Sequence, residues 1–82
     1  MKSKEEIRNW LIQQMSGLLN VEPDDVETEI PFDRYGLESA DAVGLTAELE
    51  DWMGCKIDDP TLLYEYPTIE ILSEHLAEQY AV

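Results

Sequence analysis

The sequence is short of positive charge, of cysteine and of long hydrophobic runs. It has 82 residues, with 5 Lys and Arg against 19 Asp and Glu, which gives a formal net charge of −14 at pH 7. A chain this acidic is repelled by nucleic acid and by anionic membrane surfaces, so we expect it to bind no nucleic acid. We expect its partners to carry basic patches, but the acidity of an arbitrary domain more often serves solubility alone, so both interpretations stay open.

The single cysteine, Cys55, excludes an internal disulfide bond and a metal centre made of several cysteines. The lysines near the N-terminus are followed by no apolar stretch, and no apolar run is long enough to cross a membrane. We therefore expect a cytoplasmic protein without membrane insertion. The acidic segment from Asp24 to Glu29 lacks the glycine and the ligand spacing of an EF-hand calcium loop, so we expect no metal site.

The content of hydrophobic residues, 44%, is ordinary for a folded globular chain. A chain of 82 residues is long enough for one hydrophobic core and too short for two. We therefore predict a single domain over residues 1–82, and we expect it to be a monomer. A start at Met1 and an end at Val82 favour a free-standing chain over a piece of a larger protein.

Two long helices are predicted in the first two thirds of the chain. Ser3-Lys4-Glu5-Glu6 matches a capping box and is followed by an apolar stripe at helical spacing, which predicts a helix over about residues 3–19. The second helix is predicted from Ser39, as its N-cap, to about Met53, with Gly54 as its C-cap.

The connection between these helices, about residues 20–38, is long for so small a protein. Its prolines and glycine prevent a continuous helix. After the second helix, we predict a short helical segment around residues 61–66 and a last helix that begins at the cap residue Thr68. No alternating apolar pattern typical of a strand is present. The predicted fold class is all-α, a small bundle of three main helices, one short helix and a long first loop.

Periodicity also predicts which side chains the bundle buries. We expect the first helix to bury one stripe, the long connection to be held to the core by apolar anchors, and the last helix to bury one face while its glutamates point outward. These residues are Ile7, Trp10, Leu11, Met15, Leu18 and Leu19 in the first helix; Val21, Val26, Ile30, Phe32, Tyr35 and Leu37 in the connection; and Ile69, Leu72, Leu76 and Tyr80, with Glu70, Glu74 and Glu78 outward, in the last helix.

The second helix has two different faces. Larger apolar side chains fall on one side, which we expect to join the core, whereas small and weakly apolar residues flanked by acids fall on the other. Such a strip is typical of a protein-docking surface, but the same residues can simply fill space, and periodicity does not separate the two. The core face contains Ala42, Leu45, Leu49, Trp52 and Met53; the opposite strip contains Ala40, Val43, Gly44 and Ala47, flanked by Glu48, Glu50 and Asp51.

Ser39 is the residue of greatest functional interest, because it stands where an extended segment turns into a strongly patterned helix. A phosphate attached to a hydroxyl at this position lies near free backbone N–H groups and the positive end of the helix dipole. Most serines at helix starts are plain caps, so the position alone leaves both interpretations open.

Three segments carry a resemblance to a known family. Phe32–Val43, FDRYGLESADAV, is similar to the attachment motif F-x-x-x-G-[LV]-[DE]-S. Leu49–Gly54, LEDWMG, resembles the end of the family's second helix, and Leu63–Ile69, LYEYPTI, resembles the motif [LF]-[FY]-x-x-P-T-[IV] that precedes its last helix. In this order and spacing, they make the chain similar to the acyl carrier protein superfamily, which includes the carrier domains of polyketide and nonribosomal peptide synthases.

The resemblance implies a small right-handed-type four-helix bundle and a non-catalytic carrier rather than an enzyme. It implies that Ser39 accepts 4′-phosphopantetheine from coenzyme A through a separate phosphopantetheinyl transferase, and that the terminal thiol holds acyl groups as thioesters. The other implied partners are an acyl-AMP ligase or acyltransferase and a ketosynthase or other tailoring enzymes of polyketide or fatty-acyl biosynthesis. The implied docking surface contains Glu38, Ala40, Val43, Gly44, Ala47, Glu50 and Asp51.

The chain departs from the family's usual pattern beside the serine. Glu38 stands where aspartate is usual, Ala40 where many carriers have leucine, and Gly44 where an acidic residue is common. Attachment remains the expectation, but generic partner contacts do not follow, since specificity depends on the detail of this surface. The string Tyr35–Thr46, with Leu49–Trp52 after it, looks most like carriers that work with fatty acyl-AMP ligases in polyketide-type pathways.

Two other functions stay open as alternatives. One is a peptidyl or aminoacyl carrier of a nonribosomal peptide pathway, and the other is an acidic adaptor that binds a basic partner with Ser39 unmodified. A hydrolytic triad of Ser39, Asp41 and His75 is disfavoured, because no G-x-S-x-G elbow surrounds the serine and His75 is expected at the surface or its boundary. We expect packing roles for the aromatic residues Trp10, Trp52, Tyr64 and Tyr66, and contact with the arm or its acyl chain is the alternative for the two tyrosines.

Overall fold

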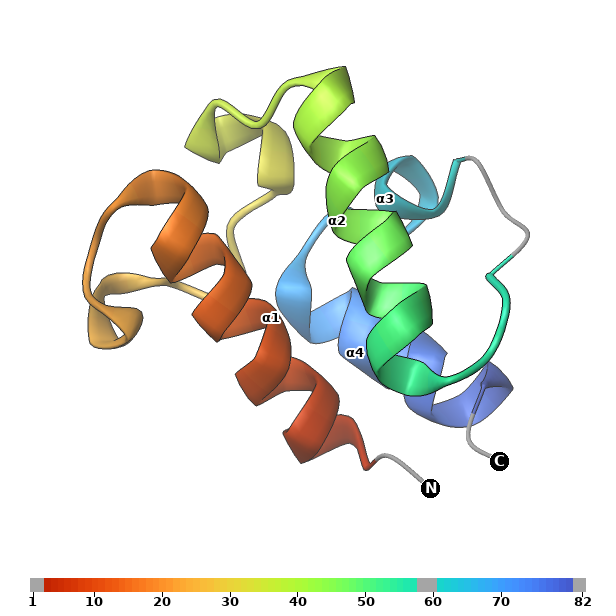
Figure 1. The fold of residues 1–82 in the computed structure, drawn as a ribbon. Coiled ribbons are helices and arrows are strands. Elements are labelled where there is room, and N and C mark those ends of the chain that lie inside the picture. Colours follow the sequence, from red (N-terminus) through yellow and green to blue (C-terminus); the bar gives the residue numbers. More distant parts are fainter. Residues whose placement is uncertain (1–2, 58–60, 81–82) are drawn as a thin grey trace.

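The computed structural model describes residues 3–57 and 61–80 of the chain, without the side chain of Ser39. Within these residues the regular elements are all helical and none is a strand, as the sequence predicts. Figure 1 shows the three long helices α1, α2 and α4 packed together, with the long first connection to one side of them. The elements are α1 (Lys4–Leu19), the 3₁₀ helices η1 (Pro23–Asp25) and η2 (Phe32–Tyr35), α2 (Ser39–Met53), α3 (Leu62–Glu65) and α4 (Ile69–Gln79).

Both ends of α1 are capped as local sequence dictates. The Ser3 hydroxyl accepts a hydrogen bond from the Glu6 backbone N–H at 3.1 Å, and the Ser3 N–H donates to Glu6 Oε1 at 3.4 Å, which confirms the predicted capping box. At the other end, Asn20 adopts the left-handed conformation with φ of 59°, and the Ser16 hydroxyl donates to the Val21 carbonyl at 2.5 Å. The helix therefore has the predicted length.

The N-cap of α2 differs from the prediction by one residue. Glu38, not Ser39, is the N-cap: its backbone is extended, yet its carbonyl already accepts the first helical hydrogen bond, from the Ala42 N–H at 2.9 Å. Ser39 is therefore the first helical residue. At the C-terminal end Gly54 has φ of 72° and donates its N–H to the Glu50 carbonyl at 2.9 Å, which confirms the predicted C-cap.

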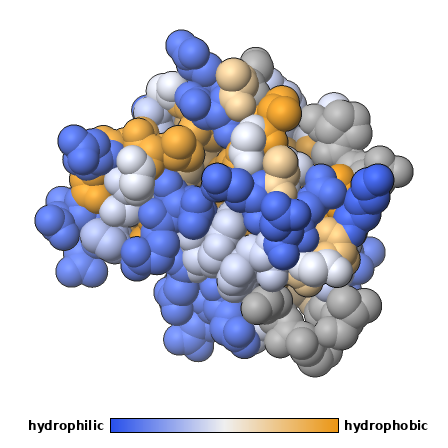
Figure 2. Space-filling model, viewed as in Figure 1, coloured by the Kyte–Doolittle hydropathy of each residue, from blue (hydrophilic) through white to orange (hydrophobic). Residues whose placement is uncertain are grey.

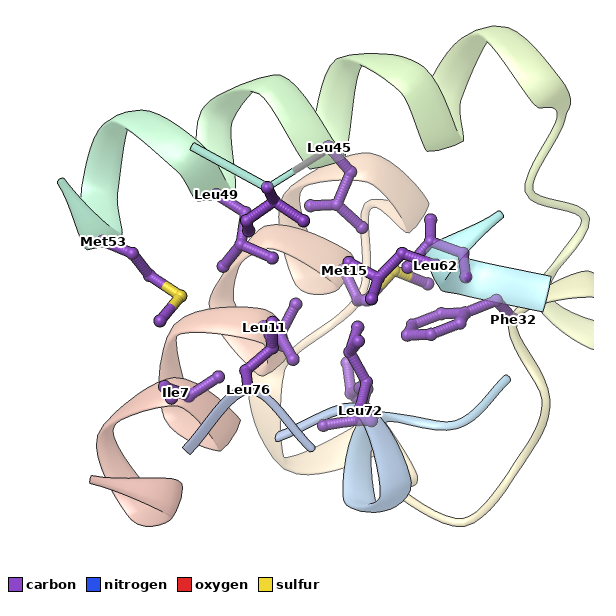
Figure 3. Packing of buried hydrophobic residues seen from close by; sticks show 14 residues of the cluster. Ile7, Leu11, Met15, Phe32, Leu45, Leu49, Met53, Leu62, Leu72 and Leu76 are labelled. Atoms are coloured by element: carbon purple, nitrogen blue, oxygen red, sulfur yellow. The ribbon is translucent and has the colours of Figure 1, made fainter. Parts of the chain in front are cut away.

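The core is a single cluster of buried apolar side chains to which every helix except η1 contributes. Figure 3 shows side chains of α1, α2 and α4 pointing toward one another, with Leu62 and Phe32 at one end of the cluster. The predicted core face of α2 is confirmed, since Leu45, Leu49 and Met53 are buried and Trp52 packs partly buried beside them. Buried apolar residues are Ile7, Leu11, Met15, Val26, Phe32, Leu45, Leu49, Met53, Ile57, Leu62, Leu63, Ile69, Leu72 and Leu76.

Two residues predicted to be buried are exposed instead. Leu18 is 49% exposed and Val21 is 41% exposed, although Leu18 continues the apolar stripe of α1. Both lie at the C-terminal end of α1 and its cap, which Figure 1 shows at the margin of the molecule, away from α2 and α4. Periodicity gives the direction in which a side chain points, but it does not reveal where the neighbouring helices end.

The long connection is attached to the corner between α3 and α4. The Phe32 N–H donates to the Pro67 carbonyl at 2.7 Å, and the Glu70 N–H donates to the Thr28 carbonyl at 3.0 Å. The Tyr35 hydroxyl donates to the Glu27 carbonyl within the connection itself. With Val26 and Phe32 buried, these bonds fix the path by which the chain reaches α2.

The last part of the chain follows the prediction except at one glutamate. The Thr68 hydroxyl accepts from the Ile71 N–H at 3.1 Å and caps α4, as expected. Glu70, however, is only partly exposed and bonds to α1, with Oε1 lying 2.8 Å from Lys4 Nζ and Oε2 lying 3.7 Å from Arg8 Nη1. The pattern of α4 alone contains no information about the cations of α1. The turn expected at Asp58-Asp59-Pro60 lies outside the described residues.

Candidate functional site

The segment before α2 turns sharply and then extends into the helix. η2 ends at Gly36, whose φ of 78° lies in the left-handed region and whose N–H donates to the Asp33 carbonyl at 3.1 Å. Glycine adopts this conformation without the steric cost of a side chain. Leu37 then packs partly buried against the core, and Glu38 is extended. Ser39 follows as the first residue of α2, at the junction that the sequence predicts.

Two carboxylates organise the start of α2. Asp41 Oδ2 accepts a hydrogen bond from the Glu38 N–H at 3.3 Å, and both residues are exposed. Negative charge in the first turn complements the positive end of the helix dipole. Glu38 and Asp41 thus form the capping box at the start of α2.

The other three serines of the chain already have structural roles. Ser3 caps α1 through its hydroxyl oxygen, and the Ser16 hydroxyl bonds to the carbonyl of Val21. Ser73 is fully buried, and its hydroxyl donates to the Glu70 carbonyl at 3.0 Å. The hydroxyl groups of these three serines are therefore engaged in structural hydrogen bonds.

An open groove of about 420 Å³ lies beside the start of α2. Its walls come from η2, from the first turn of α2 with the residues before it, and from α3, and apolar side chains form most of them. Tyr64 is one wall and is 71% exposed, so the prediction that it packs within the short helix is wrong. Such a groove can accommodate a flexible and partly apolar group near the start of α2. The lining residues are Phe32, Asp33, Leu37, Glu38, Ala42, Leu63 and Tyr64.

The outer strip of α2 faces solvent, as its periodicity predicts. Val43 is 71% exposed, and Ala40, Gly44 and Ala47 are exposed as well. Figure 2 shows orange, tan and white atoms along the upper part of α2, with blue hydrophilic atoms below them. Of the flanking acids, Glu48 and Asp51 are exposed and Glu50 is partly buried. The strip is small, weakly apolar and bordered by negative charge.

The residues of the disfavoured alternatives have other contacts. His75 lies on α4, where its ring stacks on Tyr66 with centroids 3.8 Å apart, and Asp41 serves the cap of α2. Trp10 and Trp52 stack on each other with centroids 5.1 Å apart. Over residues 3–57 and 61–80, no group of three or more His, Cys, Asp and Glu side chains is arranged to hold a metal ion, and no helix is long and apolar enough to cross a membrane.

Sequence reasoning missed two features near Ser39. It did not predict the groove, because Phe32, Leu37 and Leu63 come together only in the folded chain. It also passed over Arg34, an exposed residue of η2. A signal for Arg34 was available, since it is the only lysine or arginine between Asn9 and Cys55.

Comparisons with known proteins agree on one family. The family described as "Phosphopantetheine attachment site" matches residues 9–76. The polyketide synthase PksL of Bacillus subtilis is 34% identical over 77 residues, which are 94% of this chain and 2% of PksL. The acyl carrier protein TtuC of Teredinibacter turnerae is 32% identical over 53 residues, which are 65% of this chain and 61% of TtuC. The chain thus corresponds to a small part of the synthase.

Solved structures of carriers are similar over nearly the whole chain. An acyl carrier protein from Anabaena sp. PCC 7120 with a variant phosphopantetheinylation-site sequence has a TM-score of 0.89 and 44% identity, covering 95% of this chain and 88% of that one. A free-standing peptidyl carrier protein from Acinetobacter baumannii has a TM-score of 0.87 and 31% identity, covering 98% of this chain and 99% of that one.

These comparisons confirm the all-helical carrier bundle expected from the sequence. They include a free-standing peptidyl carrier and a segment of a large synthase. Because the family match extends over most of the residues, the chain belongs to the phosphopantetheine attachment-site family: it is a carrier protein of the acyl or peptidyl type, and its cofactor is covalently attached 4′-phosphopantetheine.

Proposed function

We propose that Ser39 is the attachment point of the phosphopantetheine arm and that the chain carries acyl groups for polyketide or fatty-acyl biosynthesis. The observation that carries the attachment proposal is the position of Ser39, which begins α2 beside an open groove. The cap of α2 is formed by Glu38 and Asp41, so modification of the serine leaves the helix start intact. The other serines have structural hydrogen bonds.

The chemistry divides between the chain and a separate transferase. The Ser39 oxygen attacks the pyrophosphate of coenzyme A, the bond from phosphorus to the adenosine nucleotide half breaks, and the serine proton passes to a base of the transferase. When bound, the arm supplies a terminal thiol that holds an acyl group as a thioester. This chain contributes the attachment point and the surface that partners recognise, and the partner enzymes supply the catalysis.

The outer strip of α2 is the proposed docking surface for those enzymes. Val43 and Ala47 supply exposed apolar contact one and two turns beyond Ser39, and Glu50 and Asp51 supply charge at the rim. Glu38, Ala40 and Gly44 complete the surface near the attachment point. A small patch with electrostatic steering suits encounters that must be brief. The proposed partners are a phosphopantetheinyl transferase, an acyl-AMP ligase or acyltransferase, and a ketosynthase or tailoring enzyme.

Mass spectrometry tests the attachment directly. After incubation with coenzyme A and a phosphopantetheinyl transferase, we expect wild type to gain the mass of one arm and Ser39→Ala to gain none. Ser3→Ala is the matched control: it removes the N-cap of α1, which costs about 0.5–2 kcal/mol, but should still be modified. Circular dichroism should show Ser39→Ala to be as helical as wild type. Modification of Ser39→Ala would reject the proposal.

A peptidyl carrier remains a second candidate because of the similarity to the Acinetobacter protein, which extends over 99% of that chain. The two functions differ in the enzyme that loads the thiol. We expect the modified protein to accept a fatty acyl group from an acyl-AMP ligase and not an aminoacyl group from an adenylation domain. The reverse preference, read by mass spectrometry of the thioester, would assign the chain to the peptidyl class.

A further inference from the structure

Arg34 is an isolated positive charge in a strongly acidic part of the protein. It is the only lysine or arginine between Asn9 and Cys55. Its side chain is exposed and forms no ion pair with any acid in the described part of the chain, whereas Lys4 and Arg8 both bond to Glu70. An arginine without a partner among so many carboxylates is available to another anion.

The backbone of Arg34 is held by hydrogen bonds, although its side chain has no ion-pair partner among the described residues. The Arg34 N–H donates to the Pro31 carbonyl at 3.0 Å, and the hydroxyl of the next residue, Tyr35, bonds to the Glu27 carbonyl. Asp33 is adjacent in sequence, but neighbouring residues of a helical turn point in different directions and do not pair. The backbone of Arg34 is therefore fixed, while the charge of its guanidinium is not neutralised by Asp33.

The path of the backbone brings Arg34 close to the attachment point, because η2 ends four residues before α2 begins. Asp33 and Glu38 both line this groove, one from η2 and the other from the start of α2. Arg34 follows Asp33 in the chain, and Ser39 follows Glu38. Figure 1 shows η2 beside the beginning of α2. A phosphate on Ser39 is therefore close enough to η2 for the long side chain of Arg34 to extend toward it.

We propose that Arg34 binds the phosphodiester that joins the arm to Ser39, an inference that rests on the proposed attachment. The planar guanidinium donates two parallel hydrogen bonds to phosphate oxygens, a geometry that a lysine cannot reproduce. Because the phosphate is tethered to the same chain, its effective concentration at Arg34 is high. The pairing restrains the base of the arm toward η2 and the groove. It also offsets part of the repulsion between the negative phosphate and the carboxylates of Glu38 and Asp41.

Nuclear magnetic resonance of the loaded protein tests this contact without measuring activity. The chain has only two arginines, Arg8 and Arg34, so its side-chain Nε–H region contains two signals. On attachment of the arm, confirmed by mass spectrometry, we expect the Arg34 signal to shift several times more than that of Arg8, which is already paired with Glu70. If the Arg34 signal stays unchanged in protein that has gained the arm, the contact does not exist.

Charge-matched variants separate a local contact from a general effect of net charge. Arg34→Gln and Lys56→Gln remove one positive charge each, but Lys56 lies beyond the far end of α2, whose 15 residues span about 22 Å. We expect the phosphorus signal of the attached arm to shift in Arg34→Gln, to shift partly in Arg34→Lys, and to stay unchanged in Lys56→Gln. Equal shifts in the two glutamine variants would overturn the proposal.

The attachment and the Arg34 contact fail in different ways. If wild type gains no arm, or if Ser39→Ala gains one, the attachment at Ser39 is wrong and the Arg34 contact falls with it. If wild type gains the arm at Ser39 but the phosphorus signal has the same position in Arg34→Gln, only the Arg34 contact is wrong. Circular dichroism of Arg34→Gln should match wild type, because its exposed side chain makes no contact with the core.

Discussion

The seam between α1 and α4 and the outer strip of α2 use charge in opposite ways. At the seam, Lys4 and Arg8 meet Glu70 above fully buried side chains such as Leu11 and Leu72. On the outer strip of α2, acids stand beside exposed Val43, and no ion pair between described residues neutralises them. The protein has few cations, and two of them hold helices together.

The ion pair at the seam shifts the pKa values of both of its partners. The hydrogen bond from Lys4 lowers the pKa of the Glu70 carboxyl, and the same bond raises the pKa of Lys4. On α2, like charges repel one another and weaken the folded state, whereas the proposed function has them attract and orient a basic partner. The comparison shows that the acid at the seam is paired within the fold, while the acids of the outer strip have no ion pair among the described residues.

The largest expected effect is a difference in stability between substitutions on the two faces of α2. Leu49 is 1% exposed and Val43 is 71% exposed, and they lie on the same helix. Leu49→Ala leaves a cavity and should lower the free energy of unfolding by about 2–5 kcal/mol, whereas Val43→Ala should change it by less than about 0.5 kcal/mol. Urea unfolding measures both. A large loss of stability in Val43→Ala would show that the outer strip is structural.

The next effect should appear in partner binding rather than in folding. Changing Glu50 and Asp51 to lysine should slow loading by the cognate ligase or transferase roughly tenfold at low salt, because steering is lost. Changing Asp24 and Asp25 to lysine alters the net charge equally, away from α2, and should have a much smaller effect. The measurement is the loading rate against salt concentration.

Two outcomes refine this second prediction. Val43→Asp should weaken the docked complex at every salt concentration, because it alters the apolar contact as well as the charge. If the lysine pair on α2 and the lysine pair on η1 slow loading equally, net charge alone governs the encounter. The outer strip would then have no recognition role.

The smallest effect should come from the ion pairs of the seam. Glu70→Gln removes the bond to Lys4 and Arg8, and Glu74→Gln makes the same charge change at a side chain that is 60% exposed and 4.0 Å from Lys4. At neutral pH we expect Glu70→Gln to melt roughly 1–4 °C below Glu74→Gln, since pairs near the surface contribute little.

The pH dependence gives the seam prediction its sign. The pKa of Glu70 is lower in the folded protein than in the unfolded chain, so its contribution is fully present above the unfolded value. That contribution disappears as the pH falls through the folded value. The difference in melting temperature between Glu70→Gln and Glu74→Gln should therefore vanish in acid. A difference that persisted there would point to packing rather than charge.

Local sequence was sufficient where the deciding interactions are local. The capping box at Ser3, the left-handed glycine Gly54 and the cap at Thr68 each act within a few residues, so these helix bounds could be predicted, whereas the short 3₁₀ helices η1 and η2 were not. The attachment motif before Ser39 was also readable, because it consists of consecutive residues. The N-cap of α2 was missed by one position, since Glu38 and Asp41 serve there in place of the serine.

Features that involve two distant segments were decided only by the tertiary structure. The sequence alone determined four helices, the caps of α1 and the C-cap of α2, the two faces of α2 and the serine at its start. Folding decided that Leu18 and Tyr64 stay exposed, that Glu70 pairs with Lys4, and that η2 and α3 form a groove beside Ser39. The reason is physical: a helix determines its own periodicity and caps, whereas burial, ion pairing and grooves depend on where another helix lies and where it ends.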